Sequence, residues 1–314
     1  MRGHHAPARP GPVGPSWLGG LLLSAGLGGL GLLAAGELLA HRLTARRRPD
    51  PADHPAQYGL AYEEARFRSR DGLDLRGWWL PATTPRGTLV LAPGQEGSLD
   101  TDLHYAPPLL DQRFNVLIFD FRGHGRSAGR AVTLGYGEVM DLRGALDWLE
   151  ARGHGAVGVL GFSMGAATAL TAAAHDRRIR TVVADSPFAR LTDIVAAGLR
   201  AHHVPAPLAA PLARLALWRA SQHTGAALSV AEPARWAPQV EQPVLLMHGG
   251  RDRFVPAAAV HRLADSLAGP HEVWSVPEAD HRQLDQIQPG EYLERVVGWF
   301  ERFLVELDEQ GARR

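Results

Sequence analysis

The sequence predicts an α/β fold in which helices cover both faces of a doubly wound, mostly parallel β-sheet. Two observations carry this prediction. From residue 59 onward, short apolar runs of strand length alternate with longer helix-like segments. One apolar run, residues 156–160, leads through a Gly-x-Ser-x-Gly sequence at 161–165 into a helix of small residues. We therefore expect one eight-stranded sheet, with the chemistry at the carboxyl ends of its parallel strands.

The elements of this domain follow in order along the chain. Residues 62–70 and 73–80 predict an antiparallel hairpin, because they flank an Asp71-Gly72 turn. Further strands are expected at 88–91, 115–121, 156–160, 181–185, 243–248 and 271–276, with helices at 103–112, 136–151, after residue 163 and at 292–309.

One stretch, residues 191–242, does not follow this alternation. It is rich in Ala and Leu, is interrupted by prolines, and is far longer than a usual connection. It predicts a small helical cap over the active site; the alternative is an ordinary crossover helix with a long loop.

Composition removes several classes of chemistry. The chain has no Cys, and all of its Lys and Arg positions are Arg. A thiol nucleophile, a Schiff-base lysine and a phosphate-loop lysine are therefore excluded, and a serine–histidine pair is the natural remaining route to covalent catalysis. The formal net charge of zero gives no electrostatic argument for nucleic acid. No dinucleotide fingerprint is present, and the adjacent histidine pairs lack carboxylate partners, so neither a cofactor nor a metal is expected.

The N-terminal part has a different composition. Residues 1–16 are rich in Pro, Gly and His and are expected to be disordered. Residues 17–40 are apolar apart from Glu37 and long enough to cross a bilayer, which predicts a single-pass transmembrane anchor. A cleaved signal peptide and a buried helix are the alternatives. Residues 41–58 then form a proline-containing linker to the domain at 59–314.

The orientation of this anchor follows from its flanking charges. Arg42 and residues 46–48, which are all Arg, come after the span, whereas Arg2 and Arg9 precede it. The positive-inside rule therefore favours a cytoplasmic catalytic domain, with an extracytoplasmic domain as the alternative.

Ser163 is the candidate nucleophile. A serine between two glycines, at a sharp turn from strand to helix, is the sequence form of a nucleophile elbow. The turn exposes the hydroxyl above the sheet, and the N-terminus of the following helix stabilises developing negative charge. The alternative is a helix N-cap in a Gly-rich turn, as in nucleotide-binding folds.

A nucleophilic serine needs a histidine base and a carboxylate that orients it. His281 follows the strand at 271–276, and Asp252 follows the strand at 243–248, so both fall on loops at the same edge of the sheet as Ser163. Asp185 competes with Asp252 for the role of the acid, because it lies at the end of the preceding strand. Asp185-Ser-Pro is more typical of a strand-to-helix cap, so Asp252 is favoured. Asp280 adjoins His281 in sequence, but adjacent residues of an extended loop point apart.

With these residues in order, the chain resembles α/β-hydrolase fold serine hydrolases, and in particular the BEM46-like group of bacterial membrane-associated enzymes. The resemblance covers about residues 60–305, essentially the whole domain. It rests on five segments: Phe119-Asp-Phe-Arg-Gly-His-Gly-Arg-Ser127, Gly161-Phe-Ser-Met-Gly165, Ala184-Asp-Ser-Pro187, His248-Gly-Gly-Arg-Asp252 and Asp280-His281.

The resemblance also implies an oxyanion hole made of two backbone N–H groups. The residue after the nucleophile, Met164, supplies one of them. The loop after the strand at 88–91 supplies the other, and Gln95 occupies the donor position. The family usually has a histidine two residues before this donor, and this chain has Pro93 instead.

These inferences together predict a serine hydrolase that cleaves an ester, a thioester or a small amide through an acyl-enzyme. The apolar cap and the anchor favour a hydrophobic acyl substrate. Acyl transfer by the same residues is one alternative, and a non-catalytic protein that uses the fold for binding is another.

Overall fold

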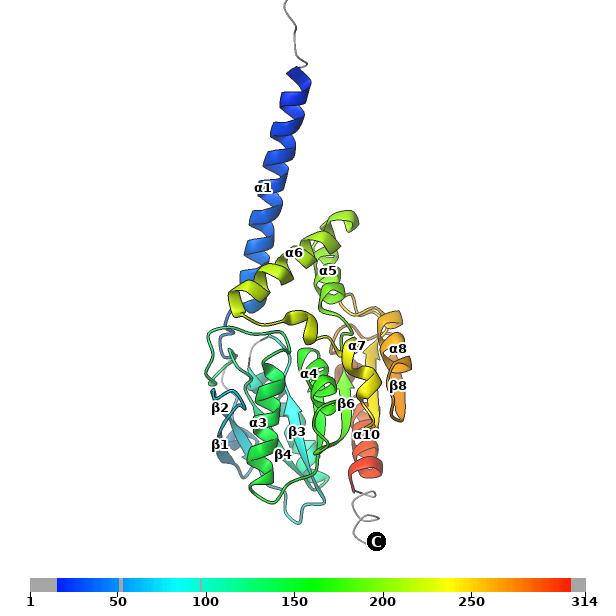
Figure 1. The fold of residues 1–314 in the computed structure, drawn as a ribbon. Helices are drawn as coiled ribbons and strands as arrows, with labels where there is room; N and C mark the ends of the chain where they lie inside the picture. The colour runs from blue at the N-terminus through cyan, green and yellow to red at the C-terminus, as the bar shows by residue number, and fades with distance from the viewer. Residues whose placement is uncertain (1–15, 51–52, 97, 306–314) are drawn as a thin grey trace, which may run out of the picture.

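The computed structural model describes residues 16–50, 53–96 and 98–305, without the side chains of residues 16–28. Within these residues, eight strands form one sheet in the order β1-β2-β4-β3-β5-β6-β7-β8 (Figure 1). The predicted eight-stranded sheet is confirmed. The strands are β1 (Glu63–Arg68), β2 (Asp74–Leu80), β3 (Gly87–Ala92), β4 (Phe114–Phe119), β5 (Val157–Phe162), β6 (Ile179–Asp185), β7 (Val244–Gly249) and β8 (His271–Val276).

Strand direction divides the sheet into two parts. β1 and β2 form the predicted antiparallel hairpin, and β2 pairs antiparallel with β4. From β4 to β8 all neighbouring strands are parallel. β3 lies between β4 and β5. The chain therefore continues from β3 to its neighbour on one side, β4, and then crosses to its neighbour on the other side, β5. Such a reversal opens a crevice at the carboxyl ends of the strands, where open α/β sheets bind ligands.

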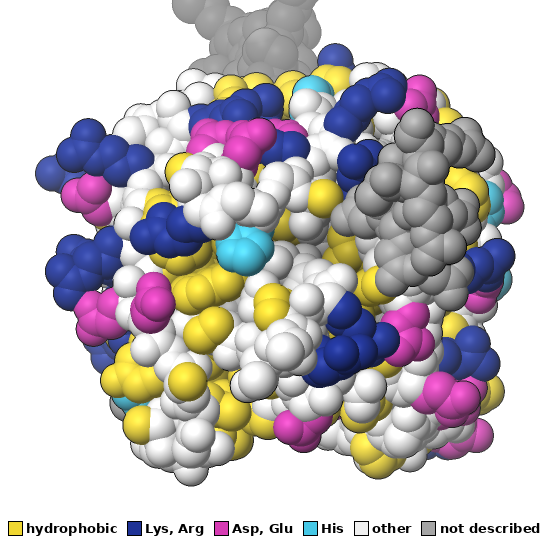
Figure 2. All heavy atoms as spheres, turned by 90° about the horizontal axis from the view of Figure 1, so that it is seen from below, with side chains coloured by type: hydrophobic (Ala, Val, Ile, Leu, Met, Phe, Trp, Pro, Cys, Tyr) yellow, Lys and Arg dark blue, Asp and Glu magenta, His cyan; other side chains and the backbone are white. Residues whose placement is uncertain are grey.

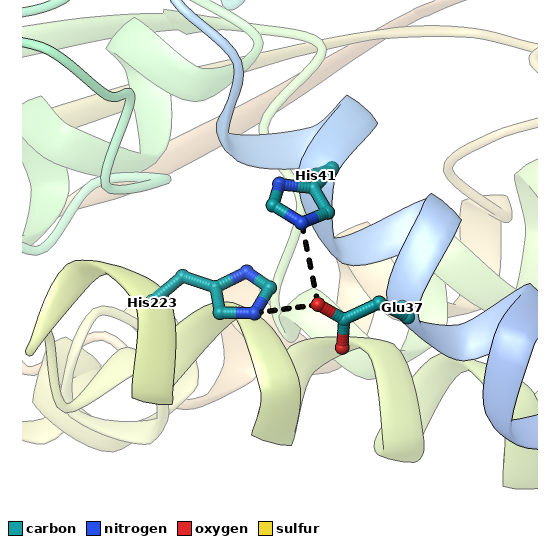
Figure 3. Close-up of side chains that lie close together, drawn as sticks. All are labelled: Glu37, His41 and His223. Atoms are coloured by element: carbon teal, nitrogen blue, oxygen red, sulfur yellow. Dashed lines mark ion pairs between the residues drawn. The ribbon is translucent and has the colours of Figure 1, made fainter.

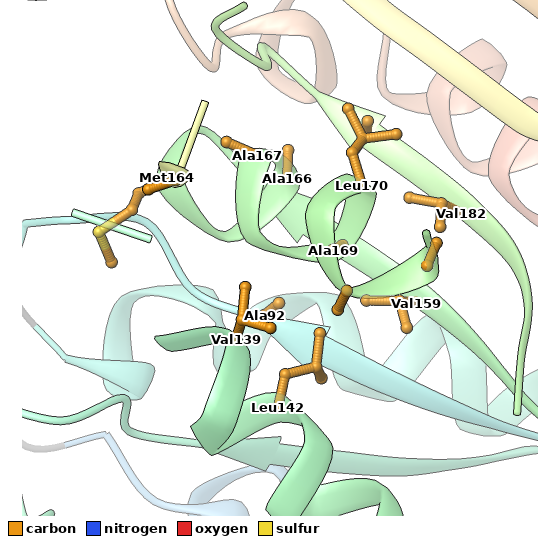
Figure 4. Packing of buried hydrophobic residues seen from close by; sticks show 14 of the residues in the cluster. Ala92, Val139, Leu142, Val159, Met164, Ala166, Ala167, Ala169, Leu170 and Val182 are labelled. Carbon is orange, nitrogen blue, oxygen red and sulfur yellow. The ribbon is translucent and has the colours of Figure 1, made fainter. Parts of the chain in front are cut away.

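Helices cover both faces of the sheet and bury two apolar clusters. On one face lie α3 (Glu138–Glu150), α4 (Met164–Ala173) and α8 (Ala257–Asp265). On the other lie α2 (Ala106–Asp111) and α10 (Pro289–Phe300). Every residue of α4 is buried, and its alanines allow it to lie close to β5 and α3 (Figure 4). The predicted α/β layering is therefore confirmed.

The stretch 191–242 contains helices, as the sequence predicts. They are α5 (Leu191–Ala201), α6 (Ala206–Thr224) and the short α7 (Pro233–Trp236), all between β6 and β7. α1 (Ser16–Thr44) runs across α6 and extends away from the sheet (Figure 1). At this crossing Gly36 lies against Leu215, and Ala40 is fully buried.

The transmembrane span expected at 17–40 is not supported. Among the residues that the structure describes, no helix is both long and apolar enough to cross a membrane, and the side chains of 16–28 lie outside them. The last turns of the expected span are in contact with protein, since the Glu37 carboxylate pairs with Arg219 of α6.

The segment expected as a linker, residues 41–58, makes specific contacts with the domain. α1 continues to Thr44, and Ala45 forms a β-bridge with Ala131. The Arg46 guanidinium donates to the carbonyl oxygens of Gly129, Gly125 and Ser127. Arg46 is therefore bound to protein groups. This weakens the use of the flanking arginines to assign the orientation of an anchor in a membrane.

The face opposite the cap carries charges of both signs. In Figure 2 basic and acidic side chains are interspersed there, with apolar side chains between them. Among the residues that the structure describes, this view shows no continuous basic patch.

Two helical glycines provide a test of this packing. A Cβ at Gly144 of α3 would lie 2.3 Å from the carbonyl oxygen of Arg68, whereas a Cβ at Gly298 of α10 would meet nothing within 4 Å. Alanine is the better helix former by roughly 0.8–1 kcal/mol. We expect Gly298→Ala to raise the free energy of unfolding and Gly144→Ala to lower it by about 1–3 kcal/mol. Urea denaturation measures both, and a stabilised Gly144→Ala would contradict the packing of α3.

Candidate active site

Ser163 lies on a strained turn between β5 and α4. Its backbone has φ 50° and ψ −107°, a conformation that costs a non-glycine residue about 1–3 kcal/mol. The two flanking glycines are required by space. A Cβ at Gly161 would lie 2.7 Å from the backbone of Ala166, and one at Gly165 would lie 1.9 Å from the carbonyl oxygen of Ala92. The sequence therefore folds here into a nucleophile elbow.

The structure brings Ser163, His281 and Asp252 into one hydrogen-bonded series. Ser163 Oγ lies 2.9 Å from His281 Nε2, and His281 Nδ1 lies 2.7 Å from Asp252 Oδ2. An imidazole protonated at Nδ1 donates to the carboxylate and accepts from the serine hydroxyl at Nε2. In this tautomer the arrangement can remove the serine proton and pass it on.

Asp252 is held firmly in its loop after β7. Its side chain is fully buried, and its Oδ1 accepts hydrogen bonds from the N–H groups of Phe254 and Val255, both at 2.8 Å. The start of this loop lies close to the loop that carries His281, because a Cβ at Gly249 would be 2.5 Å from the carbonyl oxygen of Ala279. Glycine at position 249 therefore lets the two loops lie close enough for the Asp252 carboxylate to reach the His281 ring.

The two competing aspartates have other partners. Asp185 is fully buried and accepts hydrogen bonds from Tyr292 Oη at 3.0 Å and Ser186 Oγ at 2.8 Å, while burial raises the pKa of its carboxyl. Asp280 Oδ1 accepts from the backbone N–H of His281, and its other oxygen pairs with Arg253. Neither carboxylate bonds to the imidazole ring.

The loop expected to supply the second oxyanion donor lies beside Ser163. Gln95 and Met164 line the same cavity as the Ser163 hydroxyl. The Gln95 carbonyl accepts hydrogen bonds from His124 Nε2 at 2.8 Å and from Arg47 Nε at 3.2 Å. The Gln95 side-chain amide donates to the Leu43 carbonyl at 2.9 Å. These contacts hold the loop although Pro93 replaces the histidine usual in the family.

A cavity of about 640 Å³ opens above Ser163. Most of its walls are apolar, and they come from three parts of the chain that are far apart in sequence. The apolar side chains are Leu39 and Leu43 from α1, with Ala45 just after it; Leu191, Ile194, Val195 and Leu199 from α5; and Leu134, Met164, Phe188 and Phe254 from the rest of the domain. A cavity of this size and lining is typical of a small-molecule site.

The contribution of α1 is the part that the sequence analysis missed. Leu39, Arg42 and Leu43 line the cavity, although they were expected in a membrane span and a linker. Their spacing, three and four residues apart, puts them on one face of the helix. Glu37, the single charge in the apolar run, was a signal that this end of the helix contacts protein.

Arg282 is a second residue that the sequence analysis missed. It follows His281, is largely buried, and pairs with the buried Asp102 carboxylate. Its guanidinium carbon lies 4.6 Å above the Phe162 ring, and its backbone N–H donates to Ser186 Oγ at 3.1 Å. These contacts fix the histidine loop against the ends of β5 and β6.

Comparisons with known proteins support the α/β-hydrolase fold of the domain. A family model described as alpha/beta hydrolase fold matches residues 87–204. The uncharacterised protein YqkD of Bacillus subtilis is 31% identical over 216 residues, which cover 67% of this chain and 70% of YqkD. The uncharacterised protein Rv2307c of Mycobacterium tuberculosis is 29% identical over 243 residues, 76% of this chain and 77% of the relative.

A solved structure is similar over most of the domain. The Pyrococcus furiosus esterase Pf2001 has a TM-score of 0.69 and 26% sequence identity, covering 83% of this chain and 98% of the esterase. With the strand order, the elbow and the relatives taken together, the chain belongs to the α/β-hydrolase fold family.

Proposed function

We propose that the protein is a serine hydrolase that cleaves an ester, a thioester or a small amide with a hydrophobic acyl group. One observation carries the proposal: the hydrogen-bonded series of Ser163, His281 and Asp252 opens into an apolar cavity. The similar Pyrococcus furiosus protein is an esterase, which supports an ester substrate for this chain. The intact series also argues against a protein that uses the fold for binding alone.

In the proposed reaction Ser163 Oγ attacks the acyl carbonyl while His281 Nε2 takes the hydroxyl proton. The buried Asp252 keeps the imidazole in the required tautomer and stabilises its positive charge. The backbone N–H groups of Met164 and Gln95 hold the oxyanion of the tetrahedral intermediate. His281 then protonates the leaving group, and water attacks the acyl-enzyme in the reverse sequence of proton transfers.

The lining of the cavity supports a hydrophobic acyl group. Eleven apolar side chains line the space above Ser163. The Arg and Glu side chains on its walls are fewer: Arg42, Arg47, Glu96 and Arg282. Burying each methylene of an acyl chain in such a site contributes about 0.8 kcal/mol. A medium or long chain therefore gains more binding energy here than an acetyl group.

Hydrolysis of p-nitrophenyl esters from acetyl to palmitoyl by the full chain tests the proposed function. We expect an optimum beyond acetyl, and we expect Ser163→Ala to reduce turnover by about 10⁶-fold because it removes the nucleophile. Circular dichroism establishes that the variant is folded. A Ser163→Ala protein that hydrolyses these esters at the wild-type rate would contradict the proposal.

The choice of acid is tested by two matched aspartate variants. Asp252→Asn should lower kcat by about 10⁴-fold, because the amide favours the wrong imidazole tautomer. Asp185→Asn should lower it by less than about tenfold. Burial already raises the pKa of Asp185, and the amide can keep one hydroxyl bond at its oxygen and donate to the other hydroxyl from its nitrogen. Equal losses of kcat in two equally stable variants would overturn the assignment of Asp252.

The acyl-binding role of the cavity is tested at Gly198 of α5. A Cβ there would make only ordinary contact with Phe254, at 3.7 Å, so a larger side chain extends into the cavity without displacing backbone. Gly198→Leu should shift the optimum to shorter esters and lower kcat/KM for the longest ones by about tenfold or more. Gly198→Ala is the control with little loss of space. An unchanged chain-length profile in Gly198→Leu would show that the acyl group lies elsewhere.

A further inference from the structure

A second cluster of chemically active side chains lies where α1 crosses α6. Glu37 and His41 come from successive turns of α1, and His223 comes from α6 (Figure 3). The Glu37 Oε1 atom is 3.2 Å from His41 Nε2 and 2.9 Å from His223 Nε2. Each imidazole therefore points its own Nε2 atom at Glu37 Oε1.

The three side chains have the donor set of a transition-metal site. One ligand atom from each lies within 4.8 Å of the other two, so they surround a common point. Two histidines and one carboxylate are ligands that Zn²⁺ accepts, with a water in the fourth position. The spacing of Glu37 and His41 by four residues keeps both on one face of the helix without any change of backbone.

Neighbouring groups suit this arrangement. Arg219 of α6 donates to Glu37 Oε2, which leaves Oε1 to face the histidines. A hydrogen-bonded partner on the far oxygen of a metal-binding carboxylate is a common way of orienting it. The rings of His41 and His223 are stacked with centroids 4.5 Å apart, so the two imidazoles lie together against the Glu37 carboxylate.

We propose that Glu37, His41 and His223 form a binding site for a divalent transition metal, with Zn²⁺ favoured by the donor set. The metal would tie α1 to α6. Leu39, Arg42 and Leu43 lie on the adjoining turns of α1 and line the cavity above Ser163, so the same tie would fix that wall. The site is separate from the residues proposed to act on the acyl group, and its existence does not depend on hydrolysis.

Zn²⁺ titration of the untagged full chain, stripped with a chelator, tests the site by calorimetry. We expect one equivalent to bind tightly and to raise the unfolding temperature, because the folded state alone brings the ligands together. His223→Ala and Glu37→Gln should each weaken this binding by at least about tenfold, since the loss of outer partners alone costs 10- to 100-fold. His261→Ala, an exposed histidine on α8, is the matched control and should bind as the wild type does.

Two results would overturn the site. One is Zn²⁺ affinity that is equal in His223→Ala, Glu37→Gln and His261→Ala, with all three folded by circular dichroism. The other is wild-type protein that binds no equivalent of Zn²⁺ and shows no change in unfolding temperature. Neither Zn²⁺ binding nor the unfolding temperature depends on catalysis. A protein that binds no Zn²⁺ could therefore still be a hydrolase, and a protein without hydrolase activity could still bind Zn²⁺ at this site.

Discussion

The close approach of α4 to the end of β3 is the constraint on which the rest of this structure depends. Gly165 has no room for a side chain, because the carbonyl oxygen of Ala92 occupies the place of a Cβ. This contact forces the sharp turn at Ser163 and raises the hydroxyl above the sheet. It also places Gln95, three residues after Ala92, beside Met164, so one contact positions both the nucleophile and the proposed oxyanion donors.

The second organising feature is the junction of α1 with the domain. The Leu43 carbonyl and the Arg47 guanidinium bind Gln95, and Leu39 forms part of the cavity wall. Pairing of Glu37 with Arg219 holds the helix on α6. A segment that precedes the domain in sequence therefore forms part of the cavity wall.

The sequence predicted the sheet and the Ser163–His281–Asp252 arrangement because both follow from local patterns. Strand ends in a parallel sheet meet at one edge, so loops after β5, β7 and β8 must converge. Both Asp252 and Asp185 follow strands at that edge, and the sequence favoured Asp252 because Asp185-Ser-Pro is typical of a strand-to-helix cap. In the structure Asp252 is the carboxylate that bonds to His281. The role of α1 was not predictable from its composition, because an apolar run suits lipid and a protein surface equally well. Glu37, the one charge in the run, was the sequence signal for a protein environment, and its pairing with Arg219 of α6 shows that contact.

The central claim is that Ser163 is an activated nucleophile. Treating the full chain with a fluorophosphonate, followed by intact mass spectrometry and peptide mapping, tests this claim most directly. Our account predicts one adduct per chain, located on Ser163, because an unactivated serine reacts negligibly with this reagent. Folded protein that remains unlabelled, or that carries the adduct on another residue, would contradict it.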